Sequence, residues 1–322
     1  MFSLLKSILF SKKIILLSSP LQAINYKELI FINSDLSLKL KNATILIIGD
    51  NTKDKRYIYI QNILRKISIT NNIVTVNKIF LLRILYFLLK IIKFFYKEYD
   101  LLVVGNFFSK VNKEFIDISK KTIVVDDGSN IFQTNRSIIK KKYQRINFFS
   151  IYEKKLFKKN NYNQNKLLFL KKKLISKVKK TNDVFVIGSA YVKSKYLSQE
   201  NYLRLVKNTL KTLKLKKVFY IPHPKEKIKI LKKMKFLTVV KSDYPVEIFF
   251  LEKKNYPKLI IAFHSTALIT LKIISKKFNL LNIHPNFKTV IMKKKYKHIE
   301  LMQNNYTKYL LKNGVESRNV KI

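Results

Sequence analysis

Two adjacent carboxylates, Asp126 and Asp127, stand directly before Gly128 at the end of an apolar run, in the stretch TIVVDDGSN. They stand out because the chain contains 66 Lys plus Arg residues and only 19 Asp plus Glu residues. Neighbouring carboxylates disfavour each other's ionisation, so one of the two retains its proton longer. Such a pair suits a general base that accepts a proton from a hydroxyl group. The alternative is a solvated turn, and metal binding is less favoured because adjacent side chains of an extended segment diverge.

A histidine between two prolines, His223 in YIPHPKE, is the second group that could do chemistry. Its imidazole can donate a proton or a hydrogen bond to a phosphate or a leaving group at neutral pH. Pro224 and Glu226 belong to the same stretch. A purely structural histidine is the alternative.

Ser265 and Thr266, in AFHSTALITL, stand where a helix is expected to begin. Their hydroxyl groups, the free N–H groups of the first turn and the positive end of the helix dipole together form an anion site. The alternative is that the two residues only cap the helix.

Short apolar runs alternate with helix-length segments along most of the chain, and this alternation predicts the elements that position these residues. Continuous runs of β-branched residues are typical of parallel strands that are covered on both faces. In the first half we expect strands at 13–18, 43–49, 73–76, 100–105 and 122–125, with helices at 21–30, 55–69 and 79–97. In the second half we expect strands at 183–188, 217–221, 236–240, 258–263 and 280–283, with helices at 199–213, 225–234, 245–253, 267–276 and 298–313.

The alternation stops in a Lys- and Asn-rich stretch at 137–182. We therefore predict an N-terminal domain at 1–160, a linker at 161–182, a C-terminal domain at 183–295, and a closing helix and tail at 296–322. The expected fold class is α/β, with two doubly wound, Rossmann-like domains facing across a cleft. The chain has five glycines and neither a GxGxxG motif nor a Walker glycine loop, which argues against dinucleotide and P-loop chemistry.

The candidate residues all follow expected strands, and ligands of open α/β sheets bind beyond the carboxyl ends of the strands. The acidic pair follows the last strand of the first domain, and SSPLQ at 18–22 follows its first strand. We expect a carboxylate of one domain to face a histidine and a phosphate-binding helix start of the other. This arrangement suits transfer of a group from a nucleotide donor to a hydroxyl without a metal. The absence of cysteine and the presence of only four histidines argue against a zinc site.

The net charge of +47 has three explanations. Nucleic acid and the anionic face of a membrane are two partners that would favour a positive charge, and an AT-rich coding sequence that places lysine on every solvated face is the third explanation.

Segment 79–97 combines an apolar face with a stripe of Arg and Lys, which fits either a helix in a membrane interface or a helix packed on a sheet. It carries too many charges to span a membrane. The N-terminal apolar run is broken by lysines and lacks a small-residue cleavage site, so we expect no signal peptide.

The sequence resembles the bacterial sialyltransferases, particularly glycosyltransferase family 52, the lipooligosaccharide sialyltransferase group, and more distantly the polysialyltransferases. The matching stretches follow the family's order between residues 18 and 271: SSPLQAINYKEL, VVDDGSN, FVIGS, YIPHPKE, SDYPVEIFFLE and FHSTALITL. Each stretch is short, and the ordered set is far more specific than any one of them. The resemblance implies a GT-B fold, CMP-sialic acid as the donor, inversion at the anomeric carbon, and neither a cofactor nor a metal.

The resemblance also implies a role for each candidate residue. Asp126 or Asp127, in the acceptor-side domain, would deprotonate the acceptor hydroxyl, while His223 would contact the phosphate and assist the departure of CMP. Ser265 and Thr266 would bind the phosphate in the CMP-sugar-binding domain. The other donor-side residues would be Gly128, Gly188, Ser189, Pro224, Glu226 and Glu247, the last of them holding the ribose or the base. The acceptor side of the cleft would be lined by Ser19, Pro20 and Gln22.

The chain departs from the family pattern after FVIGS, where it has AYVKS in place of a Gly-Gln-Pro-Leu-like turn. Glu200, in the segment that follows, is an alternative to the Asp pair as the base. Because family 52 contains members that transfer other sugars, a transferase of the same fold with another nucleotide sugar is the second functional hypothesis. A basic nucleic-acid-binding protein is the third, and it leaves the ordered motifs unexplained.

The enzyme implied by the resemblance would work as a peripheral protein on the cytoplasmic face of the cytoplasmic membrane. Its partners would be the CMP-sugar, a lipid-linked glycan acceptor of the lipooligosaccharide or capsule type, and an anionic membrane surface. A homodimer is an open alternative, and nucleic acid is not expected as a partner.

Overall fold

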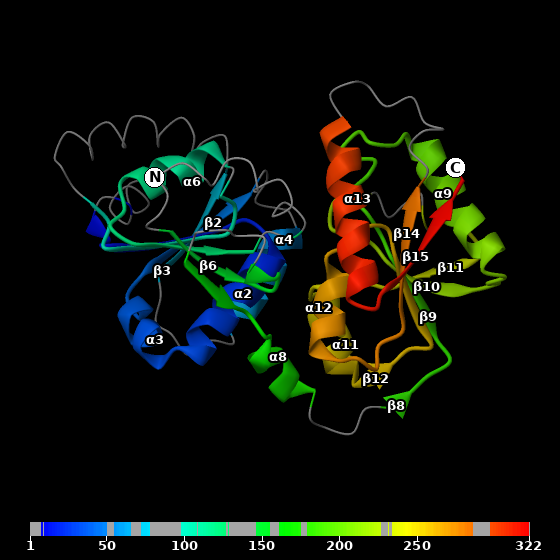
Figure 1. Ribbon diagram of the computed structural model, residues 1–322, viewed down its shortest axis with the longest axis horizontal. Coiled ribbons are helices and arrows are strands. Elements are labelled where there is room, and N and C mark those ends of the chain that lie inside the picture. The colour runs from blue at the N-terminus through cyan, green and yellow to red at the C-terminus, as the bar shows by residue number, and fades with distance from the viewer. Residues whose placement is uncertain are drawn as a thin grey trace. The chain divides into compact units, whose positions relative to one another are not determined.

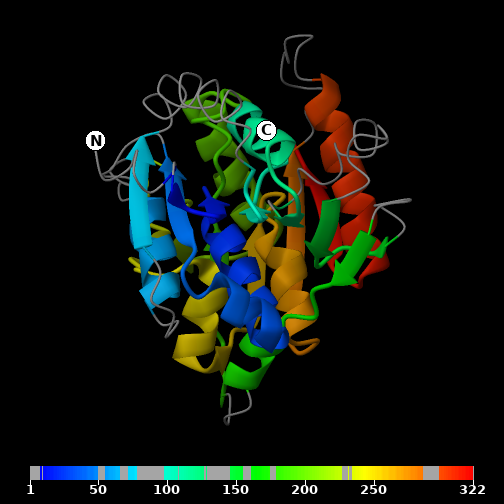
Figure 2. The same cartoon turned by 90° about the vertical axis from the view of Figure 1, so that its left-hand side faces the viewer.

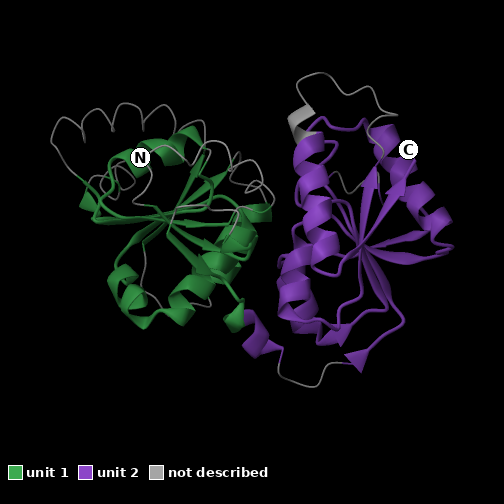
Figure 3. Cartoon of the chain, in the orientation of Figure 1, with its two compact units in different colours: residues 1–169 green, residues 170–322 purple. Residues whose placement is uncertain are grey.

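The computed structural model describes residues 8, 10–49, 55–65, 72–77, 98–107, 109–126, 128, 146–154, 161–174, 179–226, 231, 234–285 and 297–321. The chain divides into two compact units, Met1–Phe169 and Leu170–Ile322, and each is described by itself (Figure 3). The division falls inside the segment 161–182, for which the sequence predicts a linker.

Unit 1 is built on a parallel sheet whose seven described strands run in the order β3-β2-β1-β4-β5-β6-β7. The strands are β1 (Lys13–Leu17), β2 (Thr44–Gly49), β3 (Asn72–Asn77), β4 (Leu101–Val104), β5 (Thr122–Val125), β6 (Ile146–Ser150) and β7 (Asn161–Gln164). Every residue of β2, β4 and β5 is buried, as expected for parallel strands covered on both faces. The edge strand β3 and its neighbour β2 can be followed in Figure 2.

Helices cover both faces of this sheet. α2 (Pro20–Ile32) and α3 (Ser34–Leu40) lie on one face and α6 (Lys110–Asp117) on the other, while α4 (Lys55–Arg65) packs against α2 (Figure 1). The chain leaves the last strand through α8 (Leu168–Lys173).

Unit 2 repeats the architecture with six described strands in the order β11-β10-β9-β13-β14-β15, all parallel. The strands are β9 (Val184–Ile187), β10 (Val218–Ile221), β11 (Leu237–Val239), β13 (Leu259–Ala262), β14 (Leu280–Pro285) and β15 (Glu316–Val320). α9 (Gln199–Thr212) covers one face, and α11 (Val246–Lys253), α12 (Ala267–Ile274) and α13 (Lys297–Lys312) cover the other (Figure 1). A separate short pair joins β8 (Lys179–Lys180) to β12 (Asn255–Tyr256).

In both sheets the chain adds its first three strands in one direction and then places the next strand on the other side of the first one. In unit 1 the reversal lies between β1 and β4, and in unit 2 between β9 and β13. Such a switch point at the carboxyl ends of the strands is where doubly wound sheets bind their ligands. The predicted fold class, α/β with two doubly wound Rossmann-like domains as in a GT-B protein, is confirmed.

The expected strands and helices of the described regions are present, with ends that differ by a few residues at most. The structure adds the strands β6, β7, β8, β12 and β15 and the helices α3, α6 and α8. β7 pairs with β6, so the polar segment at 161–164 belongs to the sheet of unit 1. The expected helix at 79–97 and most of that at 225–234 lie outside the described residues.

Candidate active site

Three loops of unit 2 carry most of the donor-side candidates. Gly188 and Ser189 follow β9, His223 follows β10, and the pair Ser265 and Thr266 follows β13. These strands are neighbours in the order β10-β9-β13, so the three loops emerge side by side at the switch point. The donor-side candidates of these three loops are thereby brought together at the carboxyl end of one sheet, whereas Gly128 lies in unit 1 and Glu247 in α11.

The loop after β10 fixes the orientation of the His223 ring. The backbone N–H of Lys225 donates to His223 Nδ1 at 3.1 Å, so Nδ1 is an acceptor. A neutral imidazole that accepts at Nδ1 carries its proton on Nε2. The Nε2–H group is therefore the one that His223 can offer to a ligand. Pro224 follows within the same turn, in which the Glu226 N–H donates to the His223 carbonyl at 2.9 Å.

Glu226 points into the protein from this turn. Its carboxylate accepts hydrogen bonds from the Tyr220 hydroxyl at 2.7 Å and from the His223 N–H at 2.5 Å. Burial raises the pKa of Glu226 to about 7, although these hydrogen bonds act in the opposite direction. Both carboxylate oxygens are engaged by the protein, so the donor-binding role implied by the resemblance would have to act through the loop.

The helix start after β13 is held by Ser265 rather than by Thr266. Ser265 Oγ accepts from the Ala267 N–H at 3.3 Å, and its carbonyl accepts from the Tyr306 hydroxyl at 2.9 Å. Thr266 occupies the N-cap position but its side chain makes no capping hydrogen bond. Both residues are half-buried. Plain capping therefore does not account for the Thr266 hydroxyl, which leaves it suited to an anionic ligand.

His264, one residue earlier, supports this helix start in a left-handed backbone conformation with φ 49°. Its Nδ1 lies 2.8 Å from the Tyr191 hydroxyl and its Nε2 lies 3.0 Å from the Thr307 hydroxyl. Desolvation, with a smaller contribution from His284, lowers the pKa of His264 to about 3. The ring thus stays neutral and ties the β13 loop to α13. The sequence reasoning missed this role, although His264 directly precedes the Ser-Thr pair.

Glu247 lies in the first turn of α11 with only 6% of its surface exposed. Its Oε1 accepts from the Thr270 hydroxyl of α12 at 3.1 Å, and burial raises its pKa. The carboxylate therefore links two helices in the interior of unit 2. The resemblance assigns Glu247 to the ribose or the base, and the structure places its carboxylate against Thr270 of α12.

In unit 1, Asp126 follows β5 and is 4% exposed. Its Oδ2 accepts from the Ile151 N–H at 2.6 Å, and its carbonyl accepts from the Asn25 side chain at 3.3 Å. The carboxylate thus connects the ends of β5 and β6. Asp127 lies outside the described residues. Gly128 has φ 72°, a left-handed conformation that strains any residue with a side chain.

The acceptor-side candidates form the switch point of unit 1. Ser19 caps α2 by accepting from the Gln22 N–H at 3.3 Å, and Pro20 is the first residue of the helix. Gln22 is fully buried, and its Oε1 accepts from the Ser18 N–H at 2.6 Å. Its amide also fills the space beside Gly105, where an added Cβ would overlap it. Gln22 is thus enclosed by β1 and the end of β4.

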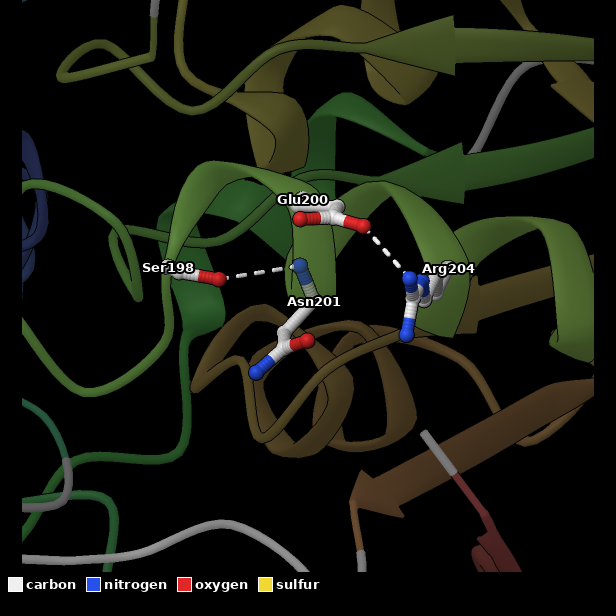
Figure 4. A network of polar contacts seen from close by, with 4 residues as sticks. All are labelled: Ser198, Glu200, Asn201 and Arg204. Atoms are coloured by element: carbon white, nitrogen blue, oxygen red, sulfur yellow. Dashed lines mark hydrogen bonds and ion pairs between the residues drawn. The ribbon is translucent and has the colours of Figure 1, made fainter.

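Glu200, the alternative base, lies on the surface in the first turn of α9. Its side chain is 71% exposed and forms an ion pair with Arg204 one turn further on, while Ser198 caps the helix (Figure 4). It follows the AYVKS loop and is not among the groups at the strand ends.

Two further observations concern other kinds of site. Among the described residues there is no group of three or more His, Asp or Glu side chains that could hold a metal ion.

A cavity of about 440 Å³ in unit 1 is lined by Lys13, Lys121 and Asn147 among others. These residues lie at the amino ends of their strands, opposite the edge where doubly wound sheets bind ligands, so the cavity is not part of the candidate site.

Two doubly wound units are the architecture of the GT-B class, and unit 2 places a histidine, a helix start and Gly188 at its switch point. The model of the alpha-2,8-polysialyltransferase family matches residues 41–281, and the chain belongs to this family. It is therefore a sialyltransferase-type glycosyltransferase. The predicted relationship to the bacterial sialyltransferases is confirmed. The match is to the polysialyltransferases, which the motifs resemble more distantly than family 52.

The likeness to solved structures is distant. A glycosyltransferase from Rickettsia africae ESF-5 has 13% identity and a TM-score of 0.37, over 95% of this chain and 95% of that one. An N-terminal ketoreductase from the macrolactin assembly line has 9% identity and a TM-score of 0.26, over 97% of this chain and 79% of that one. No curated protein matches the chain.

Proposed function

We propose that the protein is an inverting, metal-independent glycosyltransferase that moves sialic acid from CMP-sialic acid to a hydroxyl of a cell-surface glycan. The acceptor would be a lipid-linked glycan of the lipooligosaccharide or capsule type. The observation that carries the proposal is the grouping of His223, Ser265 and Thr266 in the loops that follow β10 and β13, the two strands on either side of β9, with Thr266 unused as a cap. The family to which the chain belongs supplies the class of donor.

The donor-side chemistry follows from the charge that develops on the leaving group. Sialyl transfer passes through an oxocarbenium-like state while negative charge grows on the phosphate of CMP. Pre-oriented hydrogen-bond donors at that oxygen stabilise the transition state. The Nε2–H of His223 and the hydroxyl of Thr266 are two such donors, and the start of α12 adds its dipole. The neutral ring assists the departure of CMP by donating this hydrogen bond to the phosphate.

The acceptor hydroxyl must lose one proton, and we assign its acceptance to the acidic pair Asp126 and Asp127. A positioned carboxylate base contributes about 10²–10⁴-fold to the rate. The hydrogen bond from the Ile151 N–H holds the Asp126 carboxylate in one orientation, which suits either a base or a group that orients the adjacent Asp127.

We also propose that the enzyme works at the cytoplasmic face of the membrane, where lipid-linked acceptors would be reached. No helix in the described part of the chain is long and apolar enough to cross a bilayer. The net charge of +47 would attract the chain to anionic lipids.

The test is release of CMP from CMP-sialic acid by the purified protein in EDTA, without an acceptor. We expect slow release that falls by about 10²-fold or more in His223→Ala. A matched control is Glu316→Gln, which removes an exposed carboxylate paired with Arg318. No release together with no thermal stabilisation by CMP would overturn the sialyl donor. Stabilisation by another nucleotide would then support the alternative, a transferase of the same fold that uses a different nucleotide sugar.

A further inference from the structure

A buried chain of hydrogen bonds links two of the donor-site loops through the interior of unit 2. The Ser189 N–H donates to the Tyr202 hydroxyl at 3.0 Å, and the Tyr202 and Tyr220 hydroxyls lie 2.7 Å apart. The Tyr220 hydroxyl donates to Glu226 Oε1 at 2.7 Å, and the His223 N–H donates to Glu226 Oε2 at 2.5 Å. The two tyrosine side chains are buried, at the start of α9 and within β10. The loop after β9 is therefore connected to the loop after β10 by this chain of hydrogen bonds, which we call the relay.

When Glu226 is ionised, the donor and the acceptor of every hydrogen bond in this chain are determined. An ionised carboxylate only accepts, so Tyr220 must give its one hydroxyl proton to Glu226. Tyr220 then has only a lone pair for Tyr202, which must donate to it. Tyr202 in turn accepts from the Ser189 N–H. All the donors thus point toward Glu226, and such aligned chains strengthen each member.

Gly188 places the same carboxylate against the β9 loop directly. A Cβ added at Gly188 would overlap Glu226 Oε2 and press on the Tyr220 hydroxyl. The absence of a side chain at this position is what allows the carboxylate to lie between the two loops. Glu226 is thus enclosed by Tyr220, by the backbone of His223 and by Gly188.

We propose that Glu226 is a positioning residue which, when ionised, holds the His223 loop and the Ser189 loop in one arrangement for the donor phosphate. The inference rests on the proposed function, because it gives His223 a phosphate to meet. It differs from the donor-contact role that the resemblance implies, since here Glu226 acts through the backbone of His223 and through Tyr220.

This role makes the site sensitive to pH in a defined direction. A protonated carboxyl carries an O–H group and can no longer accept from both Tyr220 and the His223 N–H. Among the residues that the structure describes, the titratable groups that face it are Tyr202 from α9, Tyr220 from β10 and His223 from its own loop, while the loop after β9 contributes Gly188 and Ser189. Burial raises the pKa of both tyrosines well above 10, so they stay neutral. Glu226, whose pKa is about 7, is the member that changes charge near neutral pH.

The first measurement is the pH dependence of CMP release in the wild type, Tyr220→Phe, Glu226→Gln and the control Glu316→Gln. We expect kcat in the wild type to fall on the acid side with a midpoint near the Glu226 pKa of about 7. Tyr220→Phe removes a hydrogen bond that lowers this pKa, so the midpoint should move to higher pH. Glu226→Gln should lose kcat about tenfold or more at pH 8, with KM changed less, because the misplaced His223 acts on the leaving group.

The second measurement needs no turnover. Protein labelled with ¹⁵N only at its four histidines gives few backbone signals, and His223→Ala assigns the one of interest. The His223 amide signal should lie far downfield and titrate with the Glu226 midpoint, move to higher pH in Tyr220→Phe, and lose that titration in Glu226→Gln. The ring signals report the titration of the imidazole separately.

The two measurements separate the possible failures. Absence of CMP release from the wild type, together with no thermal stabilisation by CMP, would overturn the proposed function, while the amide titration would still support the relay. Unchanged pH profiles and an unchanged His223 amide in both Tyr220→Phe and Glu226→Gln would overturn the positioning role. If Glu226→Gln does not fold, the shift of midpoint in Tyr220→Phe decides alone.

Discussion

The polar side chains of the site differ in how the protein holds them. His223 has its ring oriented by the Lys225 N–H and its backbone held by Glu226. Thr266 has no capping bond, whereas Asp126 is buried and bound to a backbone N–H. A residue that is fixed by its neighbours and a residue that is offered to a ligand respond differently to substitution.

Substitution can distinguish the roles of Asp126 and Asp127. Asp126→Ala removes the acceptor of the buried Ile151 N–H, and an unsatisfied buried donor costs about 1–3 kcal/mol of the free energy of unfolding. We expect Asp127→Ala to leave the midpoint of urea unfolding closer to that of the wild type. If Asp127 is the base, its removal should lower kcat by about 10²-fold or more. Urea unfolding and CMP-sialic acid turnover with an acceptor measure the two effects, and a larger stability loss in Asp127→Ala would contradict the assignment.

At the scale of elements, the helix starts at the two switch points depend on single capping residues. Ser19 caps α2, and Ser198 caps α9, which carries Tyr202 into the relay. The two caps hold the helices that follow β1 and β9.

The cap of α9 gives a direct test. Ser198 accepts from the Asn201 N–H at 3.1 Å, so Ser198→Ala should lower the free energy of unfolding by about 1 kcal/mol. Glu200→Gln, two residues away, breaks an exposed ion pair with Arg204 and should cost less than about 0.5 kcal/mol. Thermal or urea unfolding of both variants checks the order, and an equal or larger loss in Glu200→Gln would show that the cap does not hold this helix.

Sequence patterns predicted the central strands because these are short apolar runs that lie buried between helices. β9 (VFVI) and β13 (LIIA) could be read in this way. The edge strands β7 (NYNQ) and β15 (ESRNV) could not, because most of their side chains are exposed and need not be apolar. The relay was also beyond the sequence. Tyr202 and Tyr220 read as core residues, and only the packing of α9 in the core of unit 2 brings their hydroxyls together.

For the whole molecule, the buried ionisable groups of unit 2 determine how stability changes with pH. Burial raises the pKa of Glu226 from 4.5 to about 7, so the folded state binds this proton more tightly than the unfolded chain. Its contribution to stability is present in full below pH 4.5 and is lost as the pH rises through 7. His264 acts in the opposite sense, because its lowered pKa makes the folded state lose stability as the pH falls below 6.5.

A comparison with Glu226→Gln isolates the first contribution. The difference in free energy of unfolding between the wild type and Glu226→Gln should fall by about 3 kcal/mol between pH 4.5 and pH 8, at 1.36 kcal/mol per pKa unit. Urea unfolding at several pH values measures this difference. A difference that does not depend on pH would mean that Glu226 has the same pKa in the folded and unfolded states. The protein with Glu226 ionised, which is the form that the site requires, is thus less stable than the protein with Glu226 protonated.

The contact between Gly188 and Glu226 also has a genetic consequence. A side chain at 188 would meet the carboxylate at 226 and the Tyr220 hydroxyl, so we expect a substitution at 188 to be tolerated best together with a shorter residue at 226. In a library of double variants the two positions would behave as a single locus, with viable combinations rare and viable single changes at 188 rarer still. The same holds in unit 1 for Gly105 and Gln22, whose amide occupies the equivalent space. Each unit therefore contains one such linked pair at its switch point, so drift of the sequence there would have to proceed by paired changes.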